Sequence, residues 1–219
     1  MKKNLSLVLF LFVLLSVSAL AQDKPVEPKK TNARPASITE AAAEPFDKDD
    51  VKTTAAQCVR FDTEAGLIEA EMFPESAPET VRNFLNLTAI GAFDTTTFSR
   101  VVPGFVIQGG NLWSGDKMTA ELGKRARKTV PDEPNKILHQ RGVLSMARSD
   151  QPNSATTNFF ILVGDAPHLD GTFAAFGRVT KGMDVVDKIN KAPVTDEKPD
   201  KPVRITKASV VPCTASTGQ

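Results

Sequence analysis

The chain has 219 residues, with 27 Lys and Arg against 26 Asp and Glu, and a formal net charge of +1 at pH 7. Such a length suits one domain with extensions, and a nearly neutral charge provides no general attraction to nucleic acid or an anionic membrane. The chain has two His and two Cys, which excludes a cysteine-rich zinc framework and argues against a His-based metal site or a His or Cys nucleophile system.

Residues 1–21 have the pattern of a cleavable secretion signal. Two lysines follow the first Met, an apolar run covers 5–15, and small residues stand at Ala19 and Ala21. The run is too short to span a bilayer, so we expect cleavage after Ala21. The mature chain would then lie in the periplasm of a double-membraned bacterium, or outside the cell. An uncleaved membrane anchor is the alternative.

Residues 22–56 are expected to form a disordered linker. They contain four Pro, thirteen charged residues and four large apolar side chains. So few apolar groups cannot offset the entropy lost on ordering the segment. The run Ser37-Ile-Thr-Glu40 matches a capping box, but Pro45 and the lack of an apolar stripe leave any helix there marginal. We also expect a flexible tail over 214–219.

A folded domain is predicted over 57–213, beginning with a hairpin and a helix. Apolar and polar residues alternate in Val59–Phe61 and Leu67–Phe73, on either side of a turn-like segment. A helix should begin at Pro78, continue with apolar residues at helical spacing, and end at Gly91. A second helix fits Met183–Ile189. Further strands are predicted over Thr97–Val102, Val106–Gln108, Gly142–Ala147, Asn158–Val163, Thr172–Val179 and Val203–Val211.

Many short strands with two helices predict a mainly β fold, in which helices cap a β-barrel. The basic run 124–128 falls in a predicted long loop flanked by Gly and Pro. Because no net positive field supports it, a solvated loop is favoured there over a nucleic-acid site.

The two cysteines stand at the edges of this domain. Cys58 begins the first strand and Cys213 follows the last. In a closed barrel these strands are neighbours, and an exported chain meets an oxidising compartment. We therefore predict a disulfide between Cys58 and Cys213. Two unpaired thiols are the alternative, because a disulfide requires closely spaced Cα atoms.

Two motifs closely resemble the cyclophilin-type peptidyl-prolyl cis-trans isomerases. The first is FSRVVPGFVIQGG over 98–110. The second is RGVLSMAR over 141–148, continued by SATTNFFI over 154–161 and HLDG over 168–171. The resemblance covers about Val59 to Pro212 and is specific, since long motifs recur in order. It implies a closed eight-stranded antiparallel β-barrel with two capping α-helices, and an isomerase that needs no cofactor or metal.

The chemistry implied by the resemblance suits a chain poor in His and Cys. Rotation about an X–Pro bond meets a barrier of about 18–20 kcal/mol, because amide resonance is lost midway. A fixed cationic donor aimed at the proline nitrogen favours the twisted state over both planar states. Arg100 matches the family's catalytic arginine, and Gln108 matches the glutamine that binds substrate backbone and orients that arginine.

The resemblance also implies a substrate site that holds the proline ring. Apolar residues at the pocket-lining positions suit such a ring; they are Phe105, Met146, Phe160 and Leu169. Ala147 and Arg148 match positions whose backbone holds the peptide. We expect the Arg148 side chain to be free and to tune preference for substrate charge.

Four positions depart from the eukaryotic form of the pattern. Ser99 precedes the catalytic arginine where His is common, and Asn158 replaces a Gln. His168 stands where eukaryotic members have Trp, and Phe173 where many have His. Asn158, His168 and Phe173 remain in the expected substrate-binding set. Because the Trp contributes to drug contact, we predict weak cyclosporin binding.

The sequence therefore predicts a secreted or periplasmic isomerase that acts on proline-containing polypeptides and assists their folding. We expect a monomer with no nucleic-acid partner and, in the mature form, no membrane. A binding module with the same pocket and little catalysis is one alternative. A secreted barrel that carries a small apolar ligand is another, but it leaves Arg100 and the run Gln108-Gly-Gly without a purpose.

Overall fold

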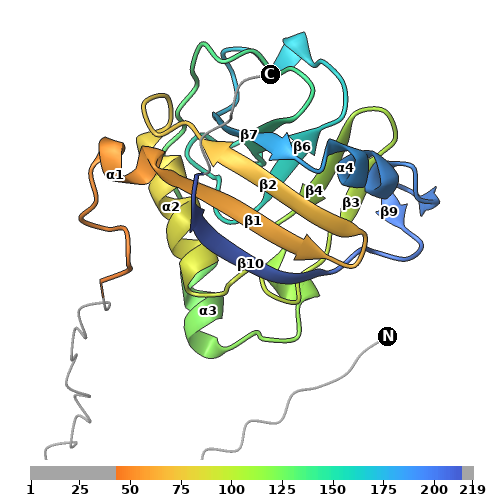
Figure 1. Ribbon diagram of the computed structural model, residues 1–219, viewed down its shortest axis with the longest axis horizontal. Coiled ribbons are helices and arrows are strands. Elements are labelled where there is room, and N and C mark those ends of the chain that lie inside the picture. Colours follow the sequence, from red (N-terminus) through yellow and green to blue (C-terminus); the bar gives the residue numbers. More distant parts are fainter. Residues whose placement is uncertain (1–42, 214–219) are drawn as a thin grey trace, which may run out of the picture. The chain divides into compact units, whose positions relative to one another are not determined.

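The computed structural model describes residues 43–213, and its main element is one antiparallel sheet of eight strands (Figure 1). Their order is β10-β1-β2-β7-β5-β6-β4-β3, and β8 and β9 form a separate hairpin. The strands are β1 Gln57–Thr63, β2 Gly66–Met72, β3 Arg100–Val102, β4 Val106–Gly109, β5 Val143–Met146, β6 Phe159–Leu162, β7 Ala175–Lys181, β8 Val194–Thr195, β9 Lys198–Pro199 and β10 Ile205–Pro212. The helices are α1 Val51–Ala55, α2 Pro78–Ala89, α3 Ala120–Arg125 and α4 Met183–Asn190, with 3-10 turns at Leu112–Ser114 and Pro167–Leu169.

The predicted closed barrel is wrong, because the sheet is an open, curled half-barrel with β10 and β3 at its edges. The chain before β3 approaches β10 through one isolated bridge, Thr97 to Arg204, and through backbone hydrogen bonds such as Thr95 N–H to the Ile205 carbonyl at 2.8 Å. Thr95 has a φ of +63°. This left-handed residue interrupts the extended backbone that a continuous ladder would need.

Both predicted helices are present as α2 and α4, and α2 provides much of the core. Pro78 stands at its start, where a missing N–H costs nothing. The carboxylate of Glu133 accepts hydrogen bonds from the N–H groups of Glu79 (3.0 Å) and Thr80 (2.8 Å), which satisfies two otherwise free donors. Phe84 is fully buried among aromatic rings of the strands. The helix thus fills the concave side of the sheet, behind β1 and β10 in Figure 1.

Two further α-helices, which the sequence does not predict, bring the number of α-helices in residues 43–213 to four. One is α3, where a loop is expected around 124–128. Thr119 accepts from the Leu122 N–H at 3.1 Å and starts the helix, while Leu122 packs against the core. No helix among residues 43–213 combines the length and apolar character needed to cross a membrane.

The other new helix, α1, lies in the segment expected to be a disordered linker, and residues 43–56 are folded. The N–H of Phe46 donates to Asn86 Oδ1 at 2.8 Å, and its ring packs against the core. Glu44 forms an ion pair with Arg125. These contacts come from distant residues of α2 and α3, so composition alone does not reveal them. The predicted signal, most of the linker and the tail lie outside the described residues.

A disulfide bond joins Cys58 and Cys213, with 2.14 Å between the sulfurs and 4.9 Å between the Cα atoms. The two residues meet because β1 and β10 are neighbours in the sheet, with Cys58 opposite Val211. The bond spans 155 residues of sequence. In the chain-entropy view, so long a closed loop stabilises the fold by about 5 kcal/mol, through its effect on the unfolded chain.

Opposite faces of β4, β5 and β6 carry two separate apolar clusters. In β6, Phe159 and Ile161 belong to the main core, whereas Phe160 and Leu162 belong to the second cluster. This division follows from the alternation of side chains along a strand. The second cluster also contains Leu169, from the segment that follows β6. It is therefore a small apolar surface on the other side of the sheet from α2.

Candidate active site

Register across four strands places a row of side chains on one face of the sheet. Arg100 of β3 is opposite Gln108 of β4, Gln108 is opposite Phe160 of β6, and Phe160 is opposite Ser145 of β5. Directly opposed residues of antiparallel strands point to the same face. The row therefore runs from a cation, through an amide, to an aromatic ring and a buried hydroxyl.

A pocket of about 190 Å³ lies over this row. It is smaller than the roughly 300–1,000 Å³ typical of sites for drug-sized ligands, and its walls are mostly apolar, with two arginines and one amide. Its lining residues are Arg100, Phe105, Val106, Gln108, Ala147, Arg148, Phe160, Leu169 and Phe173.

Arg100 lies at the edge of the pocket, and its side chain is 41% exposed. Its Nη1 donates to Gln108 Oε1 at 3.2 Å, and its Nε donates to Glu197 Oε2 at 2.7 Å. The resemblance implies the contact with Gln108. Glu197 is absent from the sequence analysis because it lies 97 residues from Arg100 and belongs to a two-residue turn.

The structure brings eight of the eleven expected catalytic and binding residues to the pocket lining, and leaves Met146, Asn158 and His168 out of it. Met146 is 2% exposed and packs in the main core. Its register partner is Phe159, which faces the core as well. Val106, which the sequence analysis does not select, lines the pocket instead. The alternation along β4 could have found it, because Val106 shares a face with Gln108.

Asn158 and His168 lie near the pocket without lining it. The carbonyl of Asn158 accepts the Ala147 N–H at 3.0 Å, which ties together the ends of β5 and β6. His168 is exposed, with its ring centroid 5.7 Å from that of Phe105. Asn158 thus supports the backbone beside the pocket, and His168 stands at the rim.

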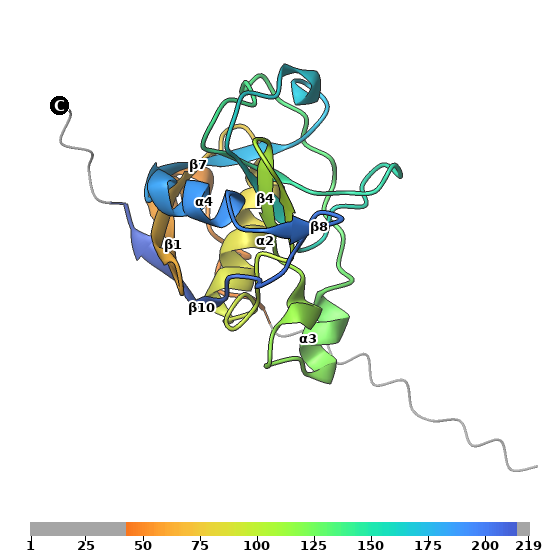
Figure 2. The same ribbon diagram turned by 90° about the vertical axis from the view of Figure 1, so that its right-hand side faces the viewer.

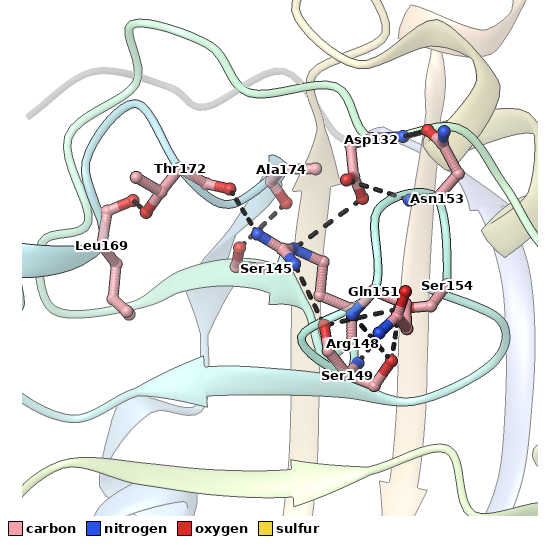
Figure 3. Close-up of polar contacts among 10 residues, drawn as sticks. All are labelled: Asp132, Ser145, Arg148, Ser149, Gln151, Asn153, Ser154, Leu169, Thr172 and Ala174. Atoms are coloured by element: carbon pink, nitrogen blue, oxygen red, sulfur yellow. Dashed lines mark hydrogen bonds and ion pairs between the residues drawn. The ribbon is translucent and has the colours of Figure 1, made fainter.

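The Arg148 side chain is held in place, contrary to the expectation that it is free (Figure 3). Its guanidinium lies 5.0 Å from the centroid of the Phe173 ring, a cation–π arrangement. Nη1 donates to the Ser149 carbonyl at 3.0 Å and Nη2 to the Thr172 carbonyl at 3.5 Å, while Nε lies 3.8 Å from Asp132 Oδ1. The aromatic ring at 173 and the distant carboxylate supply the contacts that the local sequence does not show.

A buried polar group supports the opposite wall of the pocket. The His139 side chain is fully buried, with Nδ1 3.1 Å from Asp170 Oδ1 and Nε2 3.1 Å from Ser145 Oγ. The same Asp170 oxygen accepts the backbone N–H of His139 at 2.7 Å. Since Asp170 follows Leu169 directly, these bonds fix the segment that carries the Leu169 side chain into the pocket.

Burial and hydrogen bonding shift the pKa values of both titratable groups in this support. Burial lowers the pKa of His139, and the hydrogen bond to Asp170 opposes that effect. The backbone N–H of His139 lowers the pKa of the Asp170 carboxyl. At neutral pH the pair is therefore a neutral imidazole beside a carboxylate, in which Nδ1–H donates to Asp170.

The lining residues define what this site can do chemically. None of the nine is Ser, Cys, His, Asp, Glu or Lys. Within residues 43–213, no group of three or more His, Cys, Asp or Glu side chains is arranged to hold a metal ion. The pocket can hold a small apolar ring and present guanidinium and amide N–H groups at its edge. Such a site acts by shape and electrostatics, without covalent attack by a lining residue.

Comparisons with known proteins agree with this geometry. The model of the family described as cyclophilin type peptidyl-prolyl cis-trans isomerase/CLD matches residues 58–210. A peptidyl-prolyl cis-trans isomerase of Arabidopsis thaliana is 42% identical over 141 residues, which cover 64% of this chain and 62% of that protein. Peptidyl-prolyl cis-trans isomerase A of Dickeya dadantii is 36% identical, with coverage of 72% and 86%.

A solved structure is similar in fold as well as sequence. It is the crystal structure of a Cryptosporidium parvum cyclophilin type peptidyl-prolyl cis-trans isomerase in the presence of the dipeptide Ala-Pro. The TM-score is 0.63 and the identity 28%, with coverage of 70% of this chain and 98% of that one.

Proposed function

The chain belongs to the cyclophilin-type peptidyl-prolyl cis-trans isomerases, and from this premise we propose that it isomerises X–Pro bonds in exported proteins and assists their folding. The isomerase activity follows from the family. The observation that supports its assignment to this pocket is the Arg100–Gln108 hydrogen bond beside an apolar slot. The export of the chain and its action on exported proteins are the parts of the proposal that go beyond the family.

The proposed mechanism uses the two sides of the pocket for different tasks. Phe160 and Leu169 grip the pyrrolidine ring, so that the rest of the substrate chain turns about the imide bond. As the bond twists, the proline nitrogen regains its lone pair and becomes a better acceptor. A guanidinium already fixed beside it stabilises this state more than either planar state, because Arg100 need not reorganise. Gln108 holds the guanidinium and offers its amide to the substrate backbone.

This reaction is tested by isomerisation of a proline-containing test peptide. The wild-type chain should speed cis-to-trans conversion at catalytic concentrations. Peptide binding without rate enhancement would support the alternative, a proline-peptide binding module. The residues at the pocket favour an enzyme, because a module needs the apolar wall but gains nothing from a fixed cation aimed at its edge.

Export is supported by the predicted signal over 1–21 and by the disulfide, which is typical of oxidising compartments. Expression of the full chain in a double-membraned bacterium tests it. Mass spectrometry of the periplasmic fraction should find a mature chain beginning at Gln22, with no free thiol. A full-length chain retained in the cytoplasm or membrane would contradict export.

Two further expectations concern partners. We propose weak cyclosporin binding, because an exposed His168 offers less apolar surface at the rim than the Trp of eukaryotic members. A nanomolar dissociation constant by calorimetry would contradict it.

We also propose that the mature chain is a monomer. Sedimentation of the mature chain at micromolar concentration should then give the mass of one copy.

A further inference from the structure

The tip of the β8–β9 hairpin has an unusual backbone. Asp196 and Glu197 form its two-residue turn, with φ of +49° and +62°. Turns of this kind favour Asn-Gly or Asp-Gly, because a side chain is strained at positive φ. Glu197, which has a long side chain, therefore adopts a backbone conformation that its residue type disfavours. Strain of this kind is concentrated at functional positions, where surrounding contacts maintain it.

Glu197 contacts β3 through both its backbone and its side chain. Its carbonyl accepts the Val101 N–H at 2.8 Å, and Oε2 accepts Arg100 Nε–H at 2.7 Å. The hairpin is labelled at β9 in Figure 1, where it lies beside β3, and at β8 in Figure 2. At its base, Thr195 Oγ1 donates to Asp200 Oδ1 at 3.1 Å, and the Asp200 N–H donates to the Pro193 carbonyl at 3.0 Å. The carboxylate is thus presented from a braced turn.

These contacts restrict the guanidinium of Arg100. A long side chain that is 41% exposed would otherwise sample several rotamers. Glu197 holds Nε, and Gln108 holds Nη1. Two anchors on different nitrogens fix both the position and the plane of the group. Among the described residues, no hydrogen bond uses the donors on Nη2, which stay available to a bound peptide.

We propose that Glu197 is a positioning residue for the isomerase, which orients Arg100 toward the pocket before the substrate binds. This inference rests on the catalytic role proposed for Arg100. Glu197 does not line the pocket, so any effect of Glu197 on the reacting bond passes through the Arg100 guanidinium. Preorganisation of this kind lowers the barrier more than it changes ground-state binding, so kcat should respond more than KM.

The test exploits the strain in the turn. Glu197→Gly removes the carboxylate but relieves the positive φ, so the melting temperature should stay the same or rise. We expect kcat on a proline-containing peptide to fall about three- to tenfold, with KM within about twofold. Glu197→Gln keeps an acceptor oxygen and should retain activity within about twofold of wild type. Asp196→Asn, at the neighbouring turn position, is the control and should match wild type.

A second measurement detects the contact between Glu197 and Arg100 independently of catalytic activity. In 15N-labelled protein, the Arg100 Nε–H should exchange slowly with water in the wild type and in Glu197→Gln, but fast in Glu197→Gly. Wild-type kcat in Glu197→Gly, or unchanged exchange, would overturn the positioning role while leaving the proposed function intact. An inactive wild type would instead reject the proposed function, and the exchange rates alone would then decide whether Glu197 fixes the guanidinium.

Discussion

The two sides of the pocket are held in different ways. On one side, Arg100 is 41% exposed and is anchored by Glu197, which is 50% exposed, and by the half-buried Gln108. On the other side, Phe160 is 6% exposed and Leu169 is 8% exposed, and the His139 side chain behind them is fully buried. The reactive cation thus lies in solvent-accessible surroundings, whereas the ring-binding wall is part of a core.

This difference should separate the residues that determine activity from those that determine stability. Exposed ion pairs contribute about 0–1 kcal/mol to folding, so the polar side can be changed with little effect on the fold. Buried rings and buried hydrogen bonds contribute several times more. We therefore expect substitutions on the polar side to lower kcat alone, and substitutions in the wall to lower stability as well. The predictions below test that separation, from the largest effect on stability to the smallest.

Phe160→Ala should give the largest loss of stability. The ring belongs to the second apolar cluster and forms part of the pocket wall. Its removal leaves a cavity and should lower the free energy of unfolding by about 3–5 kcal/mol. Urea unfolding measures this. The matched control is Phe105→Ala, which removes a ring only partly buried against the same cluster and should cost clearly less. Equal losses in the two variants would show that the buried Phe160 ring contributes no more to the fold than a partly exposed ring.

Asn190→Ala should give an intermediate loss, because Asn190 anchors the hairpin that carries Arg100. Its Oδ1 accepts the Gly104 N–H at 2.8 Å, while Nδ2 donates to the carbonyls of Val102 (2.9 Å) and Val106 (3.0 Å). Asn190 is 5% exposed and its bond to the Val106 carbonyl is buried, so that carbonyl would lose this partner away from water. We expect a loss of about 1–3 kcal/mol by thermal or urea unfolding.

Asn190→Asp refines this prediction. It keeps an acceptor for Gly104 but loses both donated bonds and buries a charge, so it should be no more stable than Asn190→Ala. A variant as stable as the wild type would contradict the anchoring role.

The buried imidazole should make stability depend on pH. Burial lowers the pKa of His139 from its ordinary value of 6.5, so the unfolded chain binds more protons than the folded chain below that pH. The contribution is fully present above pH 6.5 and is lost as the pH falls through the lower folded-state pKa. Asp170, whose pKa is lowered from 3.8, adds a similar loss only in more acidic solution.

Melting temperatures between pH 7.5 and pH 5 test this prediction. The wild type should lose stability across that range, and His139→Gln, though less stable at every pH, should show a smaller slope. Equal slopes would mean that His139 does not titrate differently in the folded and unfolded chains.

The sequence predicts most of the sheet and much of the site because both depend on local signals. The alternation of apolar and polar residues along β2 predicts a strand, and the helical spacing of apolar residues after Pro78 predicts α2; the structure contains both. The motif FSRVVPGFVIQGG places Arg100, Phe105 and Gln108, and all three line the pocket. Met146, expected in the pocket wall, packs in the main core instead, while Val106 lines the pocket. The alternation along β4 places Val106 on the same face as Gln108, and this is the local signal that identifies it.

The features missed by the sequence analysis depend on contacts between distant residues. Glu197 reaches Arg100 across 97 residues, and Glu44 reaches Arg125 across 81. Neither has a local pattern that indicates its partner. The open edge of the sheet depends on the backbone of Thr95, a residue type that rarely adopts positive φ. Composition predicts that residues 43–56 are disordered, because it contains no information about the α2 surface against which they fold.

The most direct test of the account is Arg100→Ala, measured for kcat/KM on a proline-containing peptide and for urea unfolding in the same buffer. We predict a loss of activity of about 100-fold or more, the effect of removing a preorganised transition-state donor, with an unfolding midpoint unchanged from wild type. Activity at the wild-type rate would contradict the central claim that a fixed guanidinium beside an apolar pocket favours the twisted imide.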